Sequence, residues 1–216
     1  MINARTPRIG RSRSAVRTAV SLAALLSCAA CAPDMTPIVL SSQFTPPSGS
    51  QRPAAANMRG QGSTIGPCRV YLADIRDLRL DPQSLGSVGT RPVRTTDAVA
   101  WLRSGFQSLS RSPQIRVVEG EDAGDADLTL RVELINAYVM SITQLTRAAS
   151  IVVRVQYDRA GSPPDNQVYR GSHDALNWVS AEEARSSFNA ALAEILTGVD
   201  RDVLTRCSLS SSANAK

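Results

Sequence analysis

The sequence contains a single histidine, His173, and aromatic residues make up only 4% of its 216 residues. One histidine excludes most nucleophilic and metal mechanisms, because these need a general base beside a nucleophile or a cluster of ligands. The Gly-x-Ser-x-Gly and His-Glu-x-x-His motifs of hydrolases are also absent. We therefore expect no enzymatic activity, no cofactor and no metal site, and we interpret His173 as an ordinary strand-end or loop residue.

The sequence also has no apolar run that is long enough to span a bilayer, which requires about 20 residues. Its apolar segment 18–27 follows five arginines without any acidic residue, namely Arg5, Arg8, Arg11, Arg13 and Arg17. A positive region followed by a short apolar region is typical of a secretory signal peptide. Without these five arginines the 24 basic residues fall to 19, equal to the 19 acidic residues. The basic charge therefore belongs to the leader, and we expect no nucleic-acid partner.

The signal segment ends in Leu25-Leu26-Ser27-Cys28, which resembles the lipobox of bacterial lipoproteins. This resemblance implies lipid attachment at Cys28, with Cys31 as the second choice and ordinary cleavage without lipid as the remaining alternative. Each buried methylene contributes about 0.8 kcal/mol to membrane binding, so several acyl chains, such as palmitate, anchor a protein stably. Ala29 stands where an aspartate would resemble an inner-membrane retention signal. We therefore expect an outer-membrane protein that faces the periplasm.

The composition divides the chain into four segments. We expect a signal peptide at 1–27, a lipidated N-terminus with a flexible tether rich in Pro, Ser, Gly and Ala at 28–66, a periplasmic domain at 67–208 and a disordered tail at 209–216. One apolar patch in the tether, Ile38–Leu40, could dock on the domain or on a partner strand.

Two cysteines, Cys68 and Cys207, lie at the two ends of the predicted domain. An oxidising periplasm permits a disulfide between them. On the chain-entropy model, closing so long a loop stabilises a fold by roughly 4 to 5 kcal/mol. Two buried free thiols are the alternative, and a metal site is not expected because no third or fourth ligand stands nearby.

Residue periodicity predicts the elements of this domain. Strands are expected at 68–76, 115–118, 128–140, 148–157 and 167–172, helices from about Asp97 to Pro113 and from Ser180 to about Arg206, and a loop at 81–92. Ser180 and Glu183 have the spacing of a helix capping box. We therefore expect an α+β fold in which a mainly antiparallel sheet of about four to five strands carries two helices packed on one face.

The second half of the strand predicted at 128–140 is apolar on both faces. Ile135, Ala137 and Val139 lie on the face that is polar in the first half of the strand. Because a two-sided apolar stretch needs a cover, we interpret these residues as a possible interaction surface for the tether or for a partner.

Several short motifs resemble YajG-like outer-membrane lipoproteins. They are the segment 70–76 (VYLADIR), Leu85-Gly86, the helix segment 102–106 (LRSGF) and Ala126-Asp127 before a long strand. The resemblance covers roughly 70–157. It implies a lipoprotein and transfers no catalytic residue.

Two functions fit these features. The first is a non-enzymatic module that is anchored to the membrane by lipid and binds or helps to assemble another envelope protein. The second is an auxiliary lipoprotein of an ABC-type transport system, in which the apolar faces around 135–139 would line a pocket for lipid or a small amphiphile. The oligomeric state does not follow from the sequence.

Overall fold

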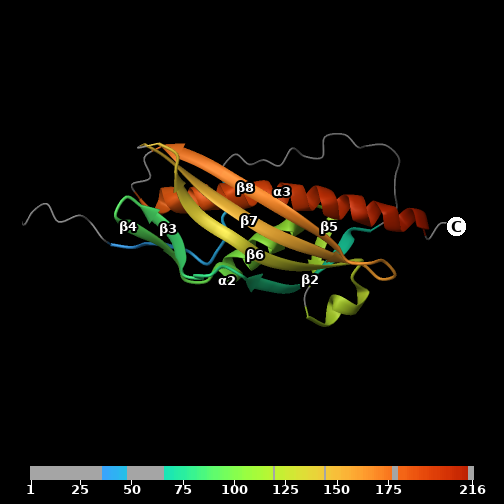
Figure 1. The fold of residues 1–216 in the computed structure, drawn as a ribbon. Coiled ribbons are helices and arrows are strands. Elements are labelled where there is room, and N and C mark those ends of the chain that lie inside the picture. Colours follow the sequence, from blue (N-terminus) through green and yellow to red (C-terminus); the bar gives the residue numbers. More distant parts are fainter. Residues whose placement is uncertain (1–35, 48–65, 119, 144, 177–179, 214–216) are drawn as a thin grey trace, which may run out of the picture. The chain divides into compact units, whose positions relative to one another are not determined.

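The computed structural model describes residues 36–47, 66–118, 120–143, 145–176 and 180–213. These residues belong to one compact unit that spans Met35–Lys216. In chain order the unit contains β1 (Ile38–Leu40), β2 (Cys68–Asp77), β3 (Ser84–Val88), β4 (Arg91–Thr95), α2 (Ala98–Gln107), β5 (Ile115–Val118), β6 (Leu128–Ser141), β7 (Thr146–Asp158), β8 (Asp165–Leu176) and α3 (Ala181–Ala213) (Figure 1). Short 3-10 helices follow α2 at Ser108–Arg111 and precede β6 at Gly120–Asp125.

The larger sheet has five strands in the order β5-β2-β6-β7-β8 (Figure 1). β2 pairs in parallel with both β5 and β6, whereas β6, β7 and β8 pair antiparallel. The prediction of a mainly antiparallel sheet is therefore wrong for its first half. Parallel pairing requires a crossover connection, and the chain from β2 to β5 supplies one that includes α2.

A second sheet of three strands has the order β1-β4-β3. Its antiparallel hairpin β3–β4 occupies residues for which the sequence predicted a loop, and Gly86 and Gly89 adopt the positive φ angles that this hairpin needs. β1 pairs in parallel with β4, from Ile38 opposite Val93 to Leu40 opposite Thr95. The folded unit thus includes residues that we had placed in the tether, and the patch Ile38–Leu40 docks on the domain itself.

The core lies against one face of the five-stranded sheet. In β6 the residues Leu128, Leu130, Val132 and Leu134 are buried, while the alternate residue Arg131 is exposed. This is the alternation that the sequence predicted for a half-buried strand. The opposite face of β6 therefore stays polar and open to solvent.

Both helices have side-chain caps at their N-termini, and the one on α3 is the capping box that the sequence predicted. The side chain of Asp97 accepts a hydrogen bond from the Ala100 amide, and Ser180 and Glu183 form a reciprocal capping box with distances of 2.9 and 3.2 Å. α2 contacts β2 and α3, whereas α3 contacts β7, β8 and β1. The helices thus pack against each other but use different strands. α3 continues to Ala213, beyond the predicted end of the domain.

Candidate functional site

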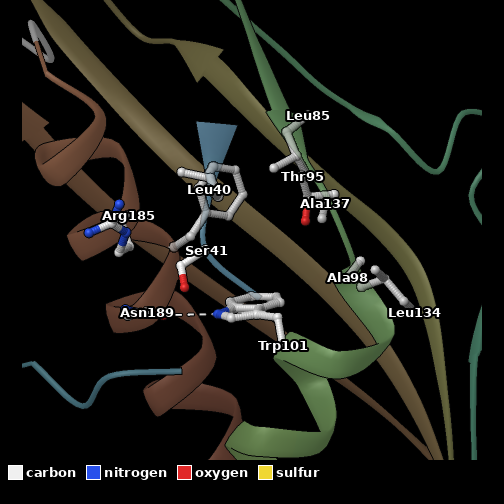
Figure 2. Close-up of a pocket in the computed structure, with 11 residues that line it drawn as sticks. Leu40, Ser41, Leu85, Thr95, Ala98, Trp101, Leu134, Ala137, Arg185 and Asn189 are labelled. Atoms are coloured by element: carbon white, nitrogen blue, oxygen red, sulfur yellow. Dashed lines mark hydrogen bonds between the residues drawn. The ribbon is translucent and has the colours of Figure 1, made fainter. Parts of the chain in front are cut away.

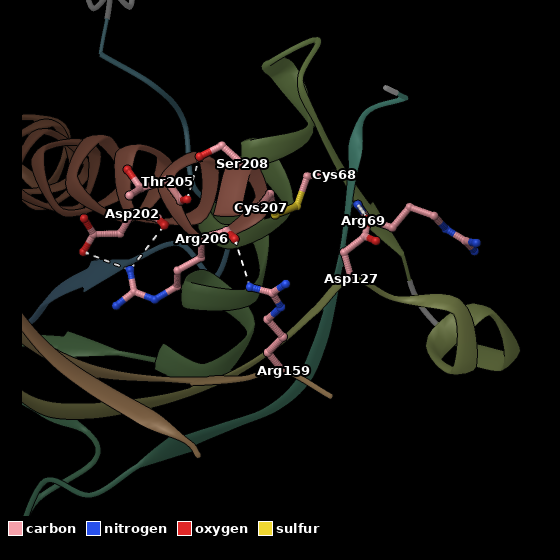
Figure 3. Close-up of a disulfide and its surroundings, with 9 residues drawn as sticks. All are labelled: Cys68, Arg69, Asp127, Arg159, Asp202, Thr205, Arg206, Cys207 and Ser208. Atoms are coloured by element: carbon pink, nitrogen blue, oxygen red, sulfur yellow. Dashed lines mark hydrogen bonds and ion pairs between the residues drawn. A yellow bond between two sulfur atoms is a disulfide. The ribbon is translucent and has the colours of Figure 1, made fainter. Parts of the chain in front are cut away.

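The predicted lipid-attachment residues Cys28 and Cys31 lie outside the residues that the structure describes. The other predicted residues can be placed. The structure contains the Cys68–Cys207 disulfide, with the two Cα atoms 6.1 Å apart. Figure 3 shows the bond between the start of β2 and the last turns of α3. It ties the C-terminal helix to the first strand of the large sheet.

The pairing register of β6 shifts between Leu134 and Asn136, so Ile135 lies in a bulge and Ala137 and Val139 follow it. Ala137 is buried, and Ile135 and Val139 are half-buried. β3 lies beside this stretch, because a Cβ on Gly86 would lie 3.3 Å from the Val139 carbonyl oxygen. The chain's own hairpin thus covers Val139. A role for these residues in partner binding stays a prediction.

A small, mostly apolar cavity lies beneath β1, between the N-terminal half of α3 and the start of α2 (Figure 2). The Trp101 indole N–H donates to Asn189 Oδ1 at 2.9 Å, and its ring meets that of Phe188 edge-on. The volume of this cavity is about 10 Å³. That is room for roughly one water molecule. The cavity is therefore a packing feature and has no space for an acyl chain.

The open polar face of the large sheet carries cross-strand ion pairs. Arg131 pairs with Asp158 at 3.0 Å, and Arg154 pairs with Glu133 at 2.8 Å. A shallow polar hollow of about 130 Å³ lies over these pairs. Because the pairs neutralise one another and are exposed, each contributes about 1 kcal/mol or less. Among the described residues, no group of His, Cys, Asp and Glu side chains is arranged to hold a metal ion.

A hydrogen-bonded cluster joins β7, β8 and the end of α3. The Tyr157 and Tyr169 hydroxyls lie 2.5 Å apart, Tyr169 donates to Asp202, and Arg206 lies 3.9 Å from the centre of the Tyr157 ring. Burial raises the pKa of both phenols, so they stay protonated and do not act as acids or bases near neutral pH. The cluster therefore serves to hold α3 on the sheet.

Arg206 also pairs with Asp165 at the start of β8. Its other terminal nitrogen lies 3.8 Å from the carboxylate of Asp202 (Figure 3). The hydrogen bond from Arg206 lowers the pKa of Asp165 below its ordinary value. Arg206, Asp165 and Asp202 are thus paired within the domain.

β8 is one of the two edge strands of the large sheet, and its outer side is free of any neighbouring strand among the described residues. The Ser172 amide donates to Glu194 of α3 at 2.9 Å, so this N–H points away from β7. Main-chain groups alternate direction along a strand, so those of Arg170 and Asp174 also point outward. Two apolar side chains on this strand, Val168 and Leu176, are 55% and 70% exposed. The longest unpaired main-chain edge in the described part of the domain is therefore β8.

This edge was not predicted from the sequence. The expected strand covered 167–172, but β8 spans Asp165–Leu176. The available signal was the polar composition of the strand, because an edge strand that faces water on one side needs few apolar residues. Its position at the edge is set by tertiary pairing, which periodicity does not report.

Comparisons with known proteins give no family. No protein-family model matches the chain, and no curated protein matches it. The resemblance to YajG-like lipoproteins accordingly stays a prediction. No helix in the described ranges is long and apolar enough to cross a membrane.

Several solved structures have a similar arrangement at low identity. A Xanthomonas campestris protein of the family described as DUF330 is 12% identical, with 81% of this chain and 97% of that chain covered and a TM-score of 0.48. Rare lipoprotein B from Shewanella oneidensis is 12% identical, with 68% and 99% covered and a TM-score of 0.37. The PelC dodecamer from Paraburkholderia phytofirmans is 13% identical, with 62% and 93% covered and a TM-score of 0.39. Because these TM-scores lie below 0.5, we draw no functional conclusion from them.

Proposed function

We propose that this chain is a non-enzymatic lipoprotein, anchored through acylated Cys28 in the outer membrane and facing the periplasm, that binds another envelope protein through the free edge of β8. The signal segment and the lipobox-like sequence that ends at Cys28 support the anchor. The observation that carries the binding role is the long unpaired edge of β8. On this edge the Ser172 N–H donates to the Glu194 side chain and not to a neighbouring strand.

An edge strand recognises an extended segment of a partner through main-chain hydrogen bonds. At β8, the outward groups of Arg170 and Asp174 would supply these bonds, and the exposed Val168 would contact a partner side chain. Glu194 must release the Ser172 amide when a strand is added, so it acts as a guard that keeps the unbound edge from pairing indiscriminately. Binding of a partner strand therefore replaces the Ser172–Glu194 hydrogen bond with a series of main-chain hydrogen bonds.

The partner strand comes from a different protein. α3 lies directly beneath β8, because a Cβ on Gly171 would lie 2.0 Å from the Ala191 carbonyl oxygen. Two copies paired symmetrically through β8 would bring their strands to about 4.8 Å. Their α3 helices would then lie closer than the 8–10 Å that helix packing requires. A partner that offers an extended segment without such a helix avoids this clash.

The geometry does not favour the alternative of a lipid or amphiphile carrier. The apolar cavity at Trp101 has a volume of only about 10 Å³. A single acyl chain needs many times the room of one water molecule. The domain offers open surfaces for contact, and we therefore favour a protein partner.

Site-specific photocrosslinking in cells tests this proposal. A photoreactive amino acid at Val168 should give one reproducible adduct with an envelope protein, and the same group at Thr197 on the exposed side of α3 should not. Arg170→Pro removes an outward N–H without breaking the ladder to β7, so it should abolish the adduct. Arg170→Ala keeps that N–H and should retain it.

Equal adducts at Val168 and Thr197, or an adduct at Val168 that survives Arg170→Pro, would exclude strand addition at β8. Urea unfolding of both Arg170 variants shows whether they stay folded, which separates loss of binding from loss of structure.

A further inference from the structure

One end of the large sheet concentrates exposed apolar side chains. Met140, Ile142 and Leu145 lie at or beside the β6–β7 hairpin and are 44%, 48% and 62% exposed. Leu176, at the end of β8, is opposite Thr146 and adds a fourth large apolar side chain to this end. We call these four residues the apolar tip. Large side chains gathered in this way mark a contact with an apolar surface.

Hydrogen bonds join the two ends of the β6–β7 hairpin beside the apolar tip. The Ile142 amide donates to the Thr146 carbonyl at 3.0 Å. Arg147 donates to the carbonyl oxygens of Thr143 and Thr146 at 2.6 and 3.2 Å. These main-chain groups are thus bonded within the hairpin. Its apolar side chains can enter a less polar medium without exposing these groups as unpaired donors.

The chain enters the folded unit at the same end of the sheet. Leu85 and Ala137 line one cavity, and Gly86 lies beside Val139, so β3 runs in the direction of β6. The β3–β4 turn therefore lies towards the hairpin end of β6. Arg91, just after this turn, donates to the Thr36 carbonyl at 3.1 Å. Figure 1 shows the β3–β4 turn and the β6–β7 hairpin at the same end of the sheet.

The sequence between Cys28 and Thr36 is short. Eight residue steps separate them, and a chain spans at most about 3.6 Å per residue, so Thr36 lies within roughly 29 Å of the anchored residue. Attachment at Cys31 would shorten this distance. We expected a tether that reached to residue 66, but the pairing of β1 with β4 ends it before Ile38. With Cys28 anchored, the start of the folded unit cannot lie farther than roughly 29 Å from the bilayer.

We propose that the apolar tip inserts into the interfacial region of the bilayer that holds the acylated Cys28, and so fixes the orientation of the domain on the membrane. This inference rests on the lipid anchor in the proposed function. Apolar side chains at a membrane interface bury themselves at the boundary between headgroups and acyl chains. With the tip in the bilayer, the β7–β8 turn at the opposite end of the sheet points into the periplasm.

Depth-dependent fluorescence quenching tests the insertion. Full-length protein with Cys31→Ser is purified in its processed form, and an environment-sensitive dye is placed at Leu145→Cys or, as the matched control, at Ser162→Cys in the β7–β8 turn. Both are reconstituted in vesicles of phosphatidylethanolamine and phosphatidylglycerol that contain a nitroxide-labelled lipid. The dye at Leu145→Cys should shift to the blue and be quenched, and the dye at Ser162→Cys should show neither change.

A second substitution separates specific insertion from dye-driven binding. Ile142→Gln should reduce quenching at Leu145→Cys, because it removes a neighbouring apolar side chain from the tip. Leu80→Gln removes a fully exposed leucine elsewhere on the domain and should leave quenching unchanged.

The outcomes separate this inference from the proposed function. Mass spectrometry of the same preparation reports whether Cys28 is acylated. If Cys28 is acylated but the two dyes are equally unquenched, the inserted tip is excluded and the anchor stands. If Cys28 carries no lipid, both the anchor and the inserted tip are overturned.

Discussion

A Cβ atom on Gly171 of β8 would lie only 2.0 Å from the carbonyl oxygen of Ala191 in α3. Strand and helix therefore meet main chain to main chain at this point. Since a carbonyl inside a helix cannot move without disturbing the helix, the contact requires glycine. It sets how α3 lies beneath β8, and thus which side of the edge strand remains open.

Gly171→Ala should destabilise the domain by about 3 kcal/mol, at the upper end of the usual cost of overpacking. Urea unfolding followed by circular dichroism measures the change. Gly66→Ala is the matched control, because a Cβ at Gly66 meets no atom within 4 Å. Equal unfolding midpoints for the two variants would show that α3 does not approach β8 so closely.

Loss of the Cys68–Cys207 disulfide should reduce the free energy of unfolding by about 2–5 kcal/mol. The bond closes a loop with a sequence separation of 139 residues, so its removal enlarges the unfolded ensemble substantially. The Cys68→Ser/Cys207→Ser double variant should unfold at a lower urea concentration than the oxidised wild type. Reduced wild type should match the variant, and a midpoint unaffected by reductant would contradict the prediction.

The pairing of Asp165 with Arg206 should make stability depend on pH in the acidic range. The hydrogen bond from Arg206 lowers the pKa of Asp165 in the folded state below its unfolded value. Its stabilising contribution is therefore present above the unfolded pKa, and it is lost as pH falls through the folded pKa. Asp165→Asn should unfold more readily than wild type at neutral pH, and the difference should disappear in strong acid. A constant difference at every pH would exclude this origin.

Glu194→Ala should make the β8 edge more reactive towards strands. The substitution frees the Ser172 amide, which Glu194 otherwise occupies at 2.9 Å. Crosslinking from Val168 to the partner should therefore increase. Glu182→Ala, an exposed substitution in the first turn of α3, should leave the yield unchanged. A lower yield for Glu194→Ala would show that Glu194 contributes to the contact and does not guard it.

Local patterns predicted much of the fold. The alternation in β6, the start of α2 after Asp97 and the capping box at Ser180 lie where the sequence predicted them, because each depends on neighbouring residues. The β3–β4 hairpin was missed, since Gly86 and Pro92 interrupt the strand pattern that its pairing nevertheless accommodates.

Features set by distant residues could not be predicted in the same way. The parallel pairing of β2 with β6 joins segments that are far apart in the chain, and neither segment encodes the direction of its neighbour. β1 has only three residues, too few for a period to show. The free edge of β8 likewise depends on where the sheet ends. The sequence therefore predicted the composition of the layers better than the surfaces they leave open.

Intact-mass spectrometry of the chain extracted from membranes tests the central claim most directly, namely that a processed and acylated Cys28 fastens the domain to the bilayer. We predict a mass that corresponds to Cys28–Lys216 with covalently attached acyl chains, and no such species for Cys28→Ser. A mature product that retains residues 1–27, or one that begins at Cys28 without lipid, would contradict the account.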